Sequence, residues 1–263
     1  MKNMIIVFVF LLCIHSINAS SYPCTSYILM QLGSNIVMEG KNIYKRQSVA
    51  SISKIMTAII VLENLDVFQT IKVDDLIRKA YGSAIYIQPD DKITILDLLC
   101  GLMLRSGNDA AICLEGLVDD FVGKMNKKAK QLHMKYTTFA NSSGLDETDD
   151  GNQSCVYDMA LLMSYALNNE MFRQIIGCIK YERLDDKGYW KNKNKLLENY
   201  KYCIGGKTGY TKKAGRTLVT VAKKKDVELI CVTFRCPQDF KMHEDLYELY
   251  FKKYEYFYDL DTF

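Results

Sequence analysis

The chain has 263 residues, of which 49% are hydrophobic and 25% are charged, as in an ordinary globular protein. That balance excludes a disordered or fibrous chain, and the length allows one large domain. The formal net charge is only +3 and no dense basic stretch occurs, so nucleic acid is not expected as a partner.

The chain begins with a segment that is typical of secretory signal peptides. One lysine precedes an apolar run over residues 4–14, which is too short to span a bilayer, and small residues follow at Ala19 and beyond. We therefore expect a signal peptide over residues 1–19 and an exported, extracytoplasmic mature chain over residues 20–263. A buried N-terminal helix or an uncleaved anchor is the alternative, and membrane association stays open.

The spacing of apolar residues predicts strands near both ends of the mature chain and helices between them. The predicted strands cover residues 26–33, 35–40, 216–222 and 227–235. The predicted helices cover residues 51–65, 95–104, 109–118, 121–132 and 157–167, with a last helix from His243 onward. A loop rich in Asn, Ser, Gly and Asp covers residues 141–154.

This order of elements predicts an α+β fold. The N-terminal and C-terminal strands can form one antiparallel sheet, with the middle of the chain packed beside it as a helical lobe. Ligands are expected in the cleft between the two lobes. No internal repeat or proline-rich linker occurs, so residues 20–263 are predicted to form a single domain with two lobes.

The cysteines and histidines do not have the spacing of a metal or redox site. Of nine cysteines, Cys13 falls in the predicted signal peptide, no CxxC pair occurs, and the three histidines are isolated. Export would permit disulfides, yet Cys100, Cys113 and Cys231 lie in strongly apolar segments, where a free thiol is a common core side chain. We expect mostly free, buried thiols and no metal or organic cofactor.

Ser51 and Lys54 begin the most apolar of the predicted helices. Residues three apart on a helix project from the same face, so the two side chains can approach each other. A serine is a good nucleophile only beside a base, and a lysine is a base only if burial or nearby positive charge lowers its pKa. The apolar helix supplies burial, and Lys207 would supply the charge if it lies across the cleft. The alternative is that Ser51 merely caps the helix.

Two further short motifs offer polar groups to the same cleft. Ser106 and Asn108 interrupt two apolar helices, where a hydroxyl could relay a proton and an amide could hold substrate, although a helix cap is the simpler explanation. The segment GGKTGYT precedes a predicted strand and presents Lys207 and Thr208 to a carboxylate. A phosphate-binding loop is disfavoured because Lys201 stands where such a loop needs glycine.

In combination, the SxxK, SxN and KTG motifs resemble the signature of penicillin-binding proteins and serine β-lactamases. The chain is similar in particular to the low-molecular-weight D-alanyl-D-alanine carboxypeptidases, from about residue 26 to residue 257. The supporting stretches include ASISKIMTA, GSAIYIQPDD, LLCGLMLRSGNDAA and GGKTGYTKKAGRTLVTVA. The resemblance implies a β-lactamase/transpeptidase-like fold, and since it ends near residue 257 we expect no additional C-terminal β domain.

The resemblance also implies a double displacement at a peptide that ends in D-alanyl-D-alanine. Ser51 would attack the carbonyl of the penultimate D-alanine with Lys54 as base, and Ser106 would assist the departure of the terminal D-alanine. Water would then release the acyl group. The implied partners are peptidoglycan pentapeptides and the β-lactams that imitate their D-alanyl-D-alanine end.

Substrate binding is implied for the remaining motif residues. Asn108 would hold the acyl chain, and Lys207 and Thr208 would bind the terminal carboxylate. The oxyanion hole would use the main-chain N–H groups of Ser51 and Tyr210, the residue that follows Gly209 of the KTG motif.

Two alternatives to the carboxypeptidase interpretation remain. A serine β-lactamase shares the fold, but Glu147 does not stand in the ExxxN-like context of the deacylating glutamate of class A enzymes. An inactive relative that only binds cell-wall peptide is the second, and retained penicillin binding without turnover would identify it.

Overall fold

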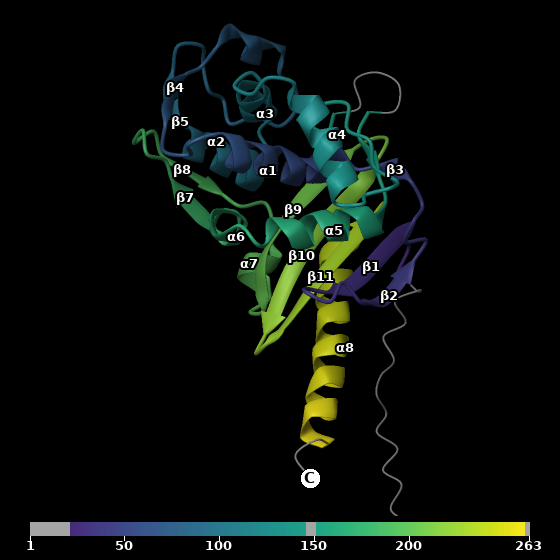
Figure 1. Cartoon of the computed structure of the whole chain (residues 1–263). Helices are drawn as coiled ribbons and strands as arrows, with labels where there is room; N and C mark the ends of the chain where they lie inside the picture. The colour runs from purple at the N-terminus through teal and green to yellow at the C-terminus, as the bar shows by residue number, and fades with distance from the viewer. Residues whose placement is uncertain (1–21, 146–150, 261–263) are drawn as a thin grey trace, which may run out of the picture.

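The computed structural model describes residues 22–145 and 151–260 (Figure 1). The predicted signal peptide, residues 1–19, and Glu147 therefore lie outside the described residues. A five-stranded antiparallel sheet has the strand order β2-β1-β11-β10-β9. Its strands are β1 (Ser26–Gln31), β2 (Val37–Lys41), β9 (Cys203–Thr211), β10 (Gly215–Lys224) and β11 (Val227–Phe234). The predicted sheet of N-terminal and C-terminal strands is confirmed.

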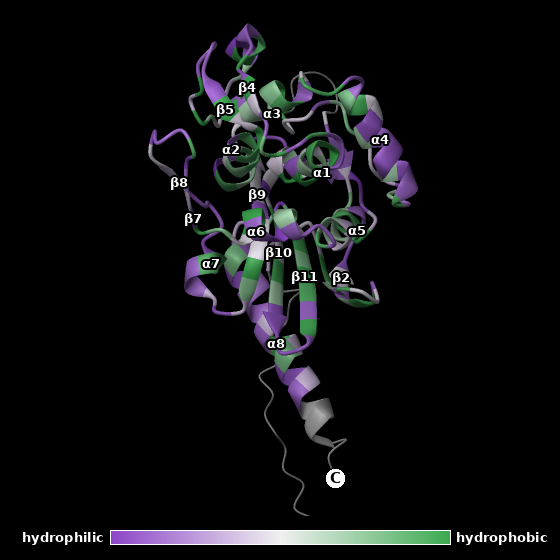
Figure 2. Ribbon diagram, turned by 60° about the vertical axis from the view of Figure 1, so that its left-hand side comes forward, coloured by the Kyte–Doolittle hydropathy of each residue, from purple (hydrophilic) through white to green (hydrophobic). Residues whose placement is uncertain are grey.

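Between β2 and β9 the described part of the chain contains seven α-helices. They are α1 (Lys54–Asn64), α2 (Ile95–Cys100), α3 (Asn108–Glu115), α4 (Phe121–Gln131), α5 (Val156–Ala166), α6 (Glu170–Gly177) and α7 (Leu196–Asn199). Short antiparallel pairs join β3 (Gln47–Ser48) to β6 (Gln153–Ser154), β4 (Thr70–Lys72) to β5 (Lys92–Thr94), and β7 (Lys180–Glu182) to β8 (Tyr189–Lys191). Figure 1 shows α1 to α4 gathered at one end of the molecule. The outer helix α4 is mostly hydrophilic (Figure 2).

The sheet separates two hydrophobic cores because successive strand side chains point to opposite faces. On β1, Ile28 and Met30 belong to the large core that contains α1, α2 and α5. Tyr27 and Leu29 belong to the smaller core on the other face. The helical side of the sheet therefore carries the SxxK and SxN motifs, and the KTG motif lies in strand β9 of the sheet itself.

The last helix, α8 (Asp239–Leu260), covers the other face of the sheet. It has 22 residues, which corresponds to about 33 Å of α-helix, and it extends beyond the sheet (Figure 1). His243 is fully buried between Thr220 and Thr233, whose hydroxyls lie 2.6 and 3.0 Å from its ring nitrogens. Burial lowers the pKa of His243 to about 3, so the ring is a neutral structural group at pH 7.

Two elements differ from the sequence-based expectation near the motifs. Residues Ala50–Ser53 form a 3₁₀ turn, η2, and the α-helix starts at Lys54 instead of at Ser51. The glycine-rich segment that contains Lys207 was expected to precede a strand, but it lies inside β9. Glycine is rare in strands, and here Gly205, Gly206 and Gly209 mark close approaches of neighbouring atoms.

The cysteines are mostly free thiols, as expected, with one exception. Cys24, just before β1, forms a disulfide with Cys236, just after β11. The two residues are 212 positions apart in sequence, and the pairing of β1 with β11 brings them together. In the described part of the chain the free cysteines are Cys100, Cys113, Cys155, Cys178, Cys203 and Cys231.

Hydropathy along the described helices does not indicate a membrane span. Within residues 22–145 and 151–260, no helix combines the length and the apolar character needed to cross a bilayer.

Candidate active site

Ser51 lies on a tight turn that begins α1. The preceding residue, Ala50, has a φ of 52°, a left-handed conformation that costs a non-glycine residue about 1–2 kcal/mol. The 3₁₀ turn Ala50–Ser53 keeps Ser51 and Lys54 on one side, and Lys54 Nζ donates a hydrogen bond of 3.2 Å to Ser51 Oγ. The predicted contact between the two side chains is therefore present, although a 3₁₀ turn rather than an α-helix creates it.

Lys54 is fully buried and has a complete set of acceptors. Besides Ser51 Oγ, its ammonium donates to Asn108 Oδ1 at 2.7 Å and to the main-chain oxygen of Ser143. Burial, helped by the charge of Lys193 and opposed by that of Asp109, lowers the pKa of Lys54 to about 7. Near neutral pH a large fraction of Lys54 is thus unprotonated and can accept the hydroxyl proton of Ser51.

The Ser106–Asn108 segment lies at the predicted break between helices. A π-helical stretch, η4 (Gly101–Arg105), ends at Ser106, which has a φ of 66°. The Ser106 hydroxyl is buried and has no hydrogen-bond partner among the described residues, which leaves it available to a bound molecule. Asn108 is buried between Lys54 and the main-chain oxygen of Tyr81, to which its amide donates at 2.6 Å. Asn108 therefore positions Lys54.

Strand β9 brings the KTG motif against the Ser51 turn. A Cβ atom at Gly209 would lie 3.0 Å from Ser51 N and 2.4 Å from Thr217 Oγ1, so only glycine allows this approach. Because β9 is an edge strand, part of its main-chain N–H groups point away from β10. The main chain on either side of Gly209 is therefore close to the main chain of Ser51. The side chain of Tyr210 is exposed.

Lys207 is the second buried lysine of the site. Its Nζ donates to the main-chain oxygen of Thr208 at 2.8 Å. Burial holds the pKa of Lys207 well below its usual range, and the charges of Lys54 and Lys193 act in the same direction. The charge of Lys54 acts on Lys207, which agrees with the expected proximity of the two residues. The cation that most lowers the pKa of Lys54, however, is Lys193.

Sequence reasoning missed Lys193, which precedes α7 by three positions. Its main-chain N–H donates to Leu104 O at 3.1 Å, and its ammonium donates to Ser83 Oγ at 3.2 Å. These bonds hold the chain after β8 against the residues that flank the Ser106–Asn108 turn. Leu104 precedes the turn in sequence, and Ser83 O accepts a hydrogen bond of 2.7 Å from Asn108 N. The only sequence signal was a lysine in the run KNKNK, which does not distinguish it from its neighbours.

The loop after α4 supplies the third acceptor of Lys54. Asn141 Oδ1 accepts from Ser143 N at 3.1 Å and from Gly144 N at 2.7 Å, which fixes the turn and directs the Ser143 carbonyl at Lys54. Gly144 has a φ of +81°, and a Cβ atom there would lie 2.2 Å from Ala50 O. These residues lie in the polar loop that was expected over residues 141–154, and no role was inferred for them from the sequence.

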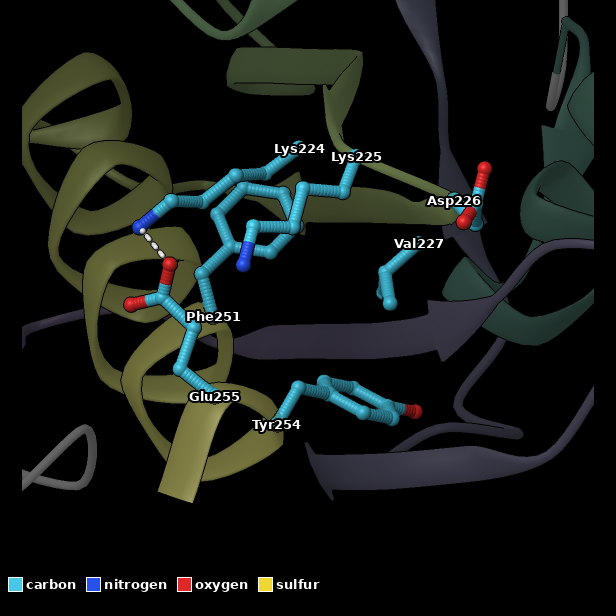
Figure 3. A pocket seen from close by; sticks show the side chains of 7 residues that line it. All are labelled: Lys224, Lys225, Asp226, Val227, Phe251, Tyr254 and Glu255. Atoms are coloured by element: carbon cyan, nitrogen blue, oxygen red, sulfur yellow. Dashed lines mark ion pairs between the residues drawn. The ribbon is translucent and has the colours of Figure 1, made fainter. Parts of the chain in front are cut away.

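A separate hollow lies away from these motifs. It is lined by Lys224, Lys225, Asp226, Val227, Phe251, Tyr254 and Glu255, between the β10–β11 turn and α8 (Figure 3). A Lys224–Glu255 ion pair of 2.9 Å crosses it. Along β10 it is seven residues from Thr217, the residue paired with Gly209, or about 23 Å at 3.3 Å per residue. The hollow is therefore distinct from the lysine-rich site.

Comparison with known proteins identifies relatives of this chain. The family described as D-alanyl-D-alanine carboxypeptidase matches residues 15–238. D-alanyl-D-alanine carboxypeptidase DacF of Bacillus subtilis is 35% identical over 227 residues, which cover 81% of this chain and 58% of DacF. DacB2 of Mycobacterium tuberculosis is 32% identical, over 79% of this chain and 73% of DacB2.

Solved structures agree with the sequence comparison. The D-alanyl-D-alanine carboxypeptidase of M. tuberculosis H37Rv superposes with a TM-score of 0.83 at 30% identity, covering 88% of this chain and 92% of that one. The Streptomyces K15 DD-transpeptidase gives a TM-score of 0.82 at 27% identity, covering 88% and 98%. The expected fold is confirmed. The chain belongs to the D-alanyl-D-alanine carboxypeptidase family of serine peptidases.

Proposed function

We propose that this protein is a serine-type D-alanyl-D-alanine carboxypeptidase that removes the terminal D-alanine from peptidoglycan stem peptides. The observation that carries the proposal is the buried lysine of lowered pKa, Lys54, whose Nζ lies 3.2 Å from Ser51 Oγ. A neutral amine in hydrogen-bond contact with a serine hydroxyl is the arrangement that activates a serine nucleophile. The chain spans 58% of the length of DacF, so the activity is proposed for this chain and not transferred from the whole relative.

In the proposed acylation step, Ser51 Oγ attacks the carbonyl carbon of the penultimate D-alanine while Lys54 takes the hydroxyl proton. The negative charge on the carbonyl oxygen is stabilised by the main-chain N–H groups of Ser51 and Tyr210, on either side of the Gly209 contact. The C–N bond then breaks. The departing amine receives a proton through Ser106, and D-alanine leaves.

Substrate recognition and turnover use the remaining motif residues. Lys207 and Thr208 bind the terminal carboxylate, and this anion would restore the charged form of Lys207, whose pKa is lowered in the free protein. Asn108 holds both Lys54 and the acyl chain. Water then attacks the ester on Ser51 and returns the free hydroxyl. A β-lactam would acylate Ser51 in the same way, because its ring carbonyl and carboxylate imitate the peptide end.

The test is release of D-alanine by the purified protein from a pentapeptide that ends in D-alanyl-D-alanine. We expect release from this peptide, no release from the same peptide with an amidated C-terminus, and inhibition by a penicillin that forms a lasting adduct. Rapid turnover of the penicillin itself would instead identify a β-lactamase. A penicillin adduct without any D-alanine release would indicate an inactive relative.

We also propose that the protein acts outside the cytoplasm, which the peptidoglycan substrate and the sequence of residues 1–19 support. The small residues that follow the apolar run predict signal-peptide cleavage after Ala19. N-terminal sequencing of protein recovered from the envelope or medium of producing cells should begin at Ser20. An intact Met1 terminus on all of the recovered protein would contradict cleavage.

A further inference from the structure

A polar groove of about 340 Å³ lies beside the Ser106–Asn108 turn. One wall is formed by residues 84–86, which come directly after Ser83, and Ser83 O accepts a hydrogen bond from Asn108 N. The other wall is strand β8, which packs against η4. Arg105, in the lining, directly precedes Ser106. The lining residues are Ala84, Ile85, Tyr86, Arg105, Tyr189, Trp190 and Lys191. The groove therefore adjoins the Ser106–Asn108 turn: Arg105 is next to Ser106 in sequence, and Ser83, next to the lining residue Ala84, is hydrogen-bonded to Asn108.

The rim residue Tyr86 is held in a costly conformation. Its φ is 62°, which is rare for a bulky side chain, and the residue is 81% exposed. The buried carboxylate of Asp109 accepts from Ile85 N at 3.0 Å and from Tyr86 N at 2.8 Å, and these bonds fix the turn. A large apolar ring kept in a strained conformation and exposed to water is better explained by ligand contact than by folding.

The floor of the groove is rigid and apolar. Ile85 and Trp190 are both buried there, and Gly101 allows their approach, since a Cβ atom at that position would lie 2.6 Å from Ile85 and 3.4 Å from Trp190. Tyr189, on β8, also lines the groove and is 58% exposed. Two exposed aromatic rings thus border a preformed surface.

The charge of the groove is positive. Arg105 and Lys191 line it, whereas no carboxylate does. Arg105 Nη1 donates to Lys191 O at 3.2 Å, and among the described residues no acidic side chain forms an ion pair with Arg105. Lys191 is paired with Glu198, so Arg105 is the cation that remains available for an anionic ligand. A guanidinium in a groove that is also lined by aromatic residues suits a carboxylate attached to a peptide or sugar.

We propose that this groove is an accessory subsite that binds a carboxylate-bearing part of peptidoglycan outside the two terminal D-alanines. The carboxylate pairs with Arg105, and the attached chain packs between Tyr86 and Tyr189. The bound part comes either from the same stem peptide or from a neighbouring, cross-linked one. The inference rests on the proposed function, and it implies that the protein prefers large peptidoglycan fragments over short peptides.

The first arm of the test compares substrates within each variant. Values of kcat/KM are measured for diacetyl-L-lysyl-D-alanyl-D-alanine, for a disaccharide pentapeptide monomer, and for a cross-linked dimer that retains one pentapeptide. Arg105→Gln should lower the ratio of kcat/KM for the large substrates to kcat/KM for the short peptide about tenfold, as for a lost charge-assisted hydrogen bond. Tyr86→Ala should lower it severalfold, and Arg78→Gln, an exposed arginine paired with Asp75, should leave it unchanged. A loss for the dimer alone assigns the carboxylate to the neighbouring strand.

The second arm does not depend on turnover. Titration calorimetry of Ser51→Ala protein with disaccharide tetrapeptide, as monomer and as cross-linked dimer, should show a Kd about tenfold weaker when Arg105→Gln is added. Unchanged Kd values for both ligands, together with unchanged substrate ratios, would overturn the subsite. Arg105-dependent binding by a protein that releases no D-alanine would refute the proposed function and leave the subsite standing.

Discussion

Replacement of Lys54 by methionine is expected to slow acylation by a fluorescent penicillin roughly 10²–10⁴-fold, the usual contribution of a general base. Methionine fills nearly the same volume without a basic nitrogen, so Ser51 would keep its turn but lose its proton acceptor. The rate is followed by in-gel fluorescence at several times. Burial of an ammonium is costly, so the variant should melt no lower than the wild type. Acylation at the wild-type rate would exclude Lys54 as the base.

The same reasoning gives a pH profile. The pKa of Lys54 is lowered to about 7, so the neutral, active amine grows as pH rises through 7 and the acylation rate should rise with it to a plateau. Removing the charge of Lys193 by Lys193→Met should raise the pKa of Lys54 and move the midpoint to higher pH. A rate that is flat from pH 6 to 8 in the wild type would contradict this assignment.

Gly144→Ala is the second substitution with a large expected effect. The new Cβ atom would lie 2.2 Å from Ala50 O and 2.5 Å from Ser53 Oγ, so the Ser51 turn or the Ser143 carbonyl must move. Displacements of about 1 Å at a reacting group cost about 10² in rate. We expect a loss of that order in the rate of penicillin acylation, measured on protein shown by circular dichroism to be folded.

Gly33→Ala is a matched control for this substitution. Gly33 has a φ of +87°, close to the +81° of Gly144, but a Cβ atom there has no neighbour within 4 Å. The backbone strain is therefore similar and the clash is absent. Gly33→Ala should acylate at the wild-type rate. Equal rates in the two variants would show that the contact between Gly144 and Ala50 does not position Ser51.

The sequence predicted the site best where a short motif met a strong hydrophobic pattern. Ser51 and Lys54 were expected on one face because they are three residues apart at the start of a very apolar predicted helix, and they are in contact in the structure. The break at Ser106 followed from Gly107 and Asn108 between two apolar segments. The sheet followed from the alternation in residues 216–235, whose side chains divide between the two cores.

The parts that sequence reasoning missed depend on contacts between distant segments. The strand character of the KTG segment is set by pairing with β10 and not by its glycine-rich composition. The disulfide between Cys24 and Cys236 requires the β1–β11 register, which no local pattern contains. Lys193 matters because its charge acts on the two buried lysines, Lys54 and Lys207, and a lysine in a polar stretch gives no sign of that.

The site is consequently built at a cost to stability. Lys54 and Lys207 are both fully buried, and the positive charges of Lys54 and Lys193 oppose protonation of Lys207. Asp109 is the one carboxylate that raises the pKa of Lys54, and its oxygens accept hydrogen bonds from the main-chain N–H groups of residues 85, 86 and 110. The arrangement favours a neutral amine over a stable ion pair, as a serine nucleophile requires.

The most direct test of this account is to locate the penicillin adduct by mass spectrometry. Trypsin cleaves after Arg46 and Lys54, so the acylated protein yields the peptide Gln47–Lys54, which contains Ser48, Ser51 and Ser53. The account predicts one penicillin per chain, with fragment ions that place it on Ser51. An adduct on Ser48, on Ser53 or outside this peptide, or no adduct at all, would contradict the assignment of Ser51 as the nucleophile.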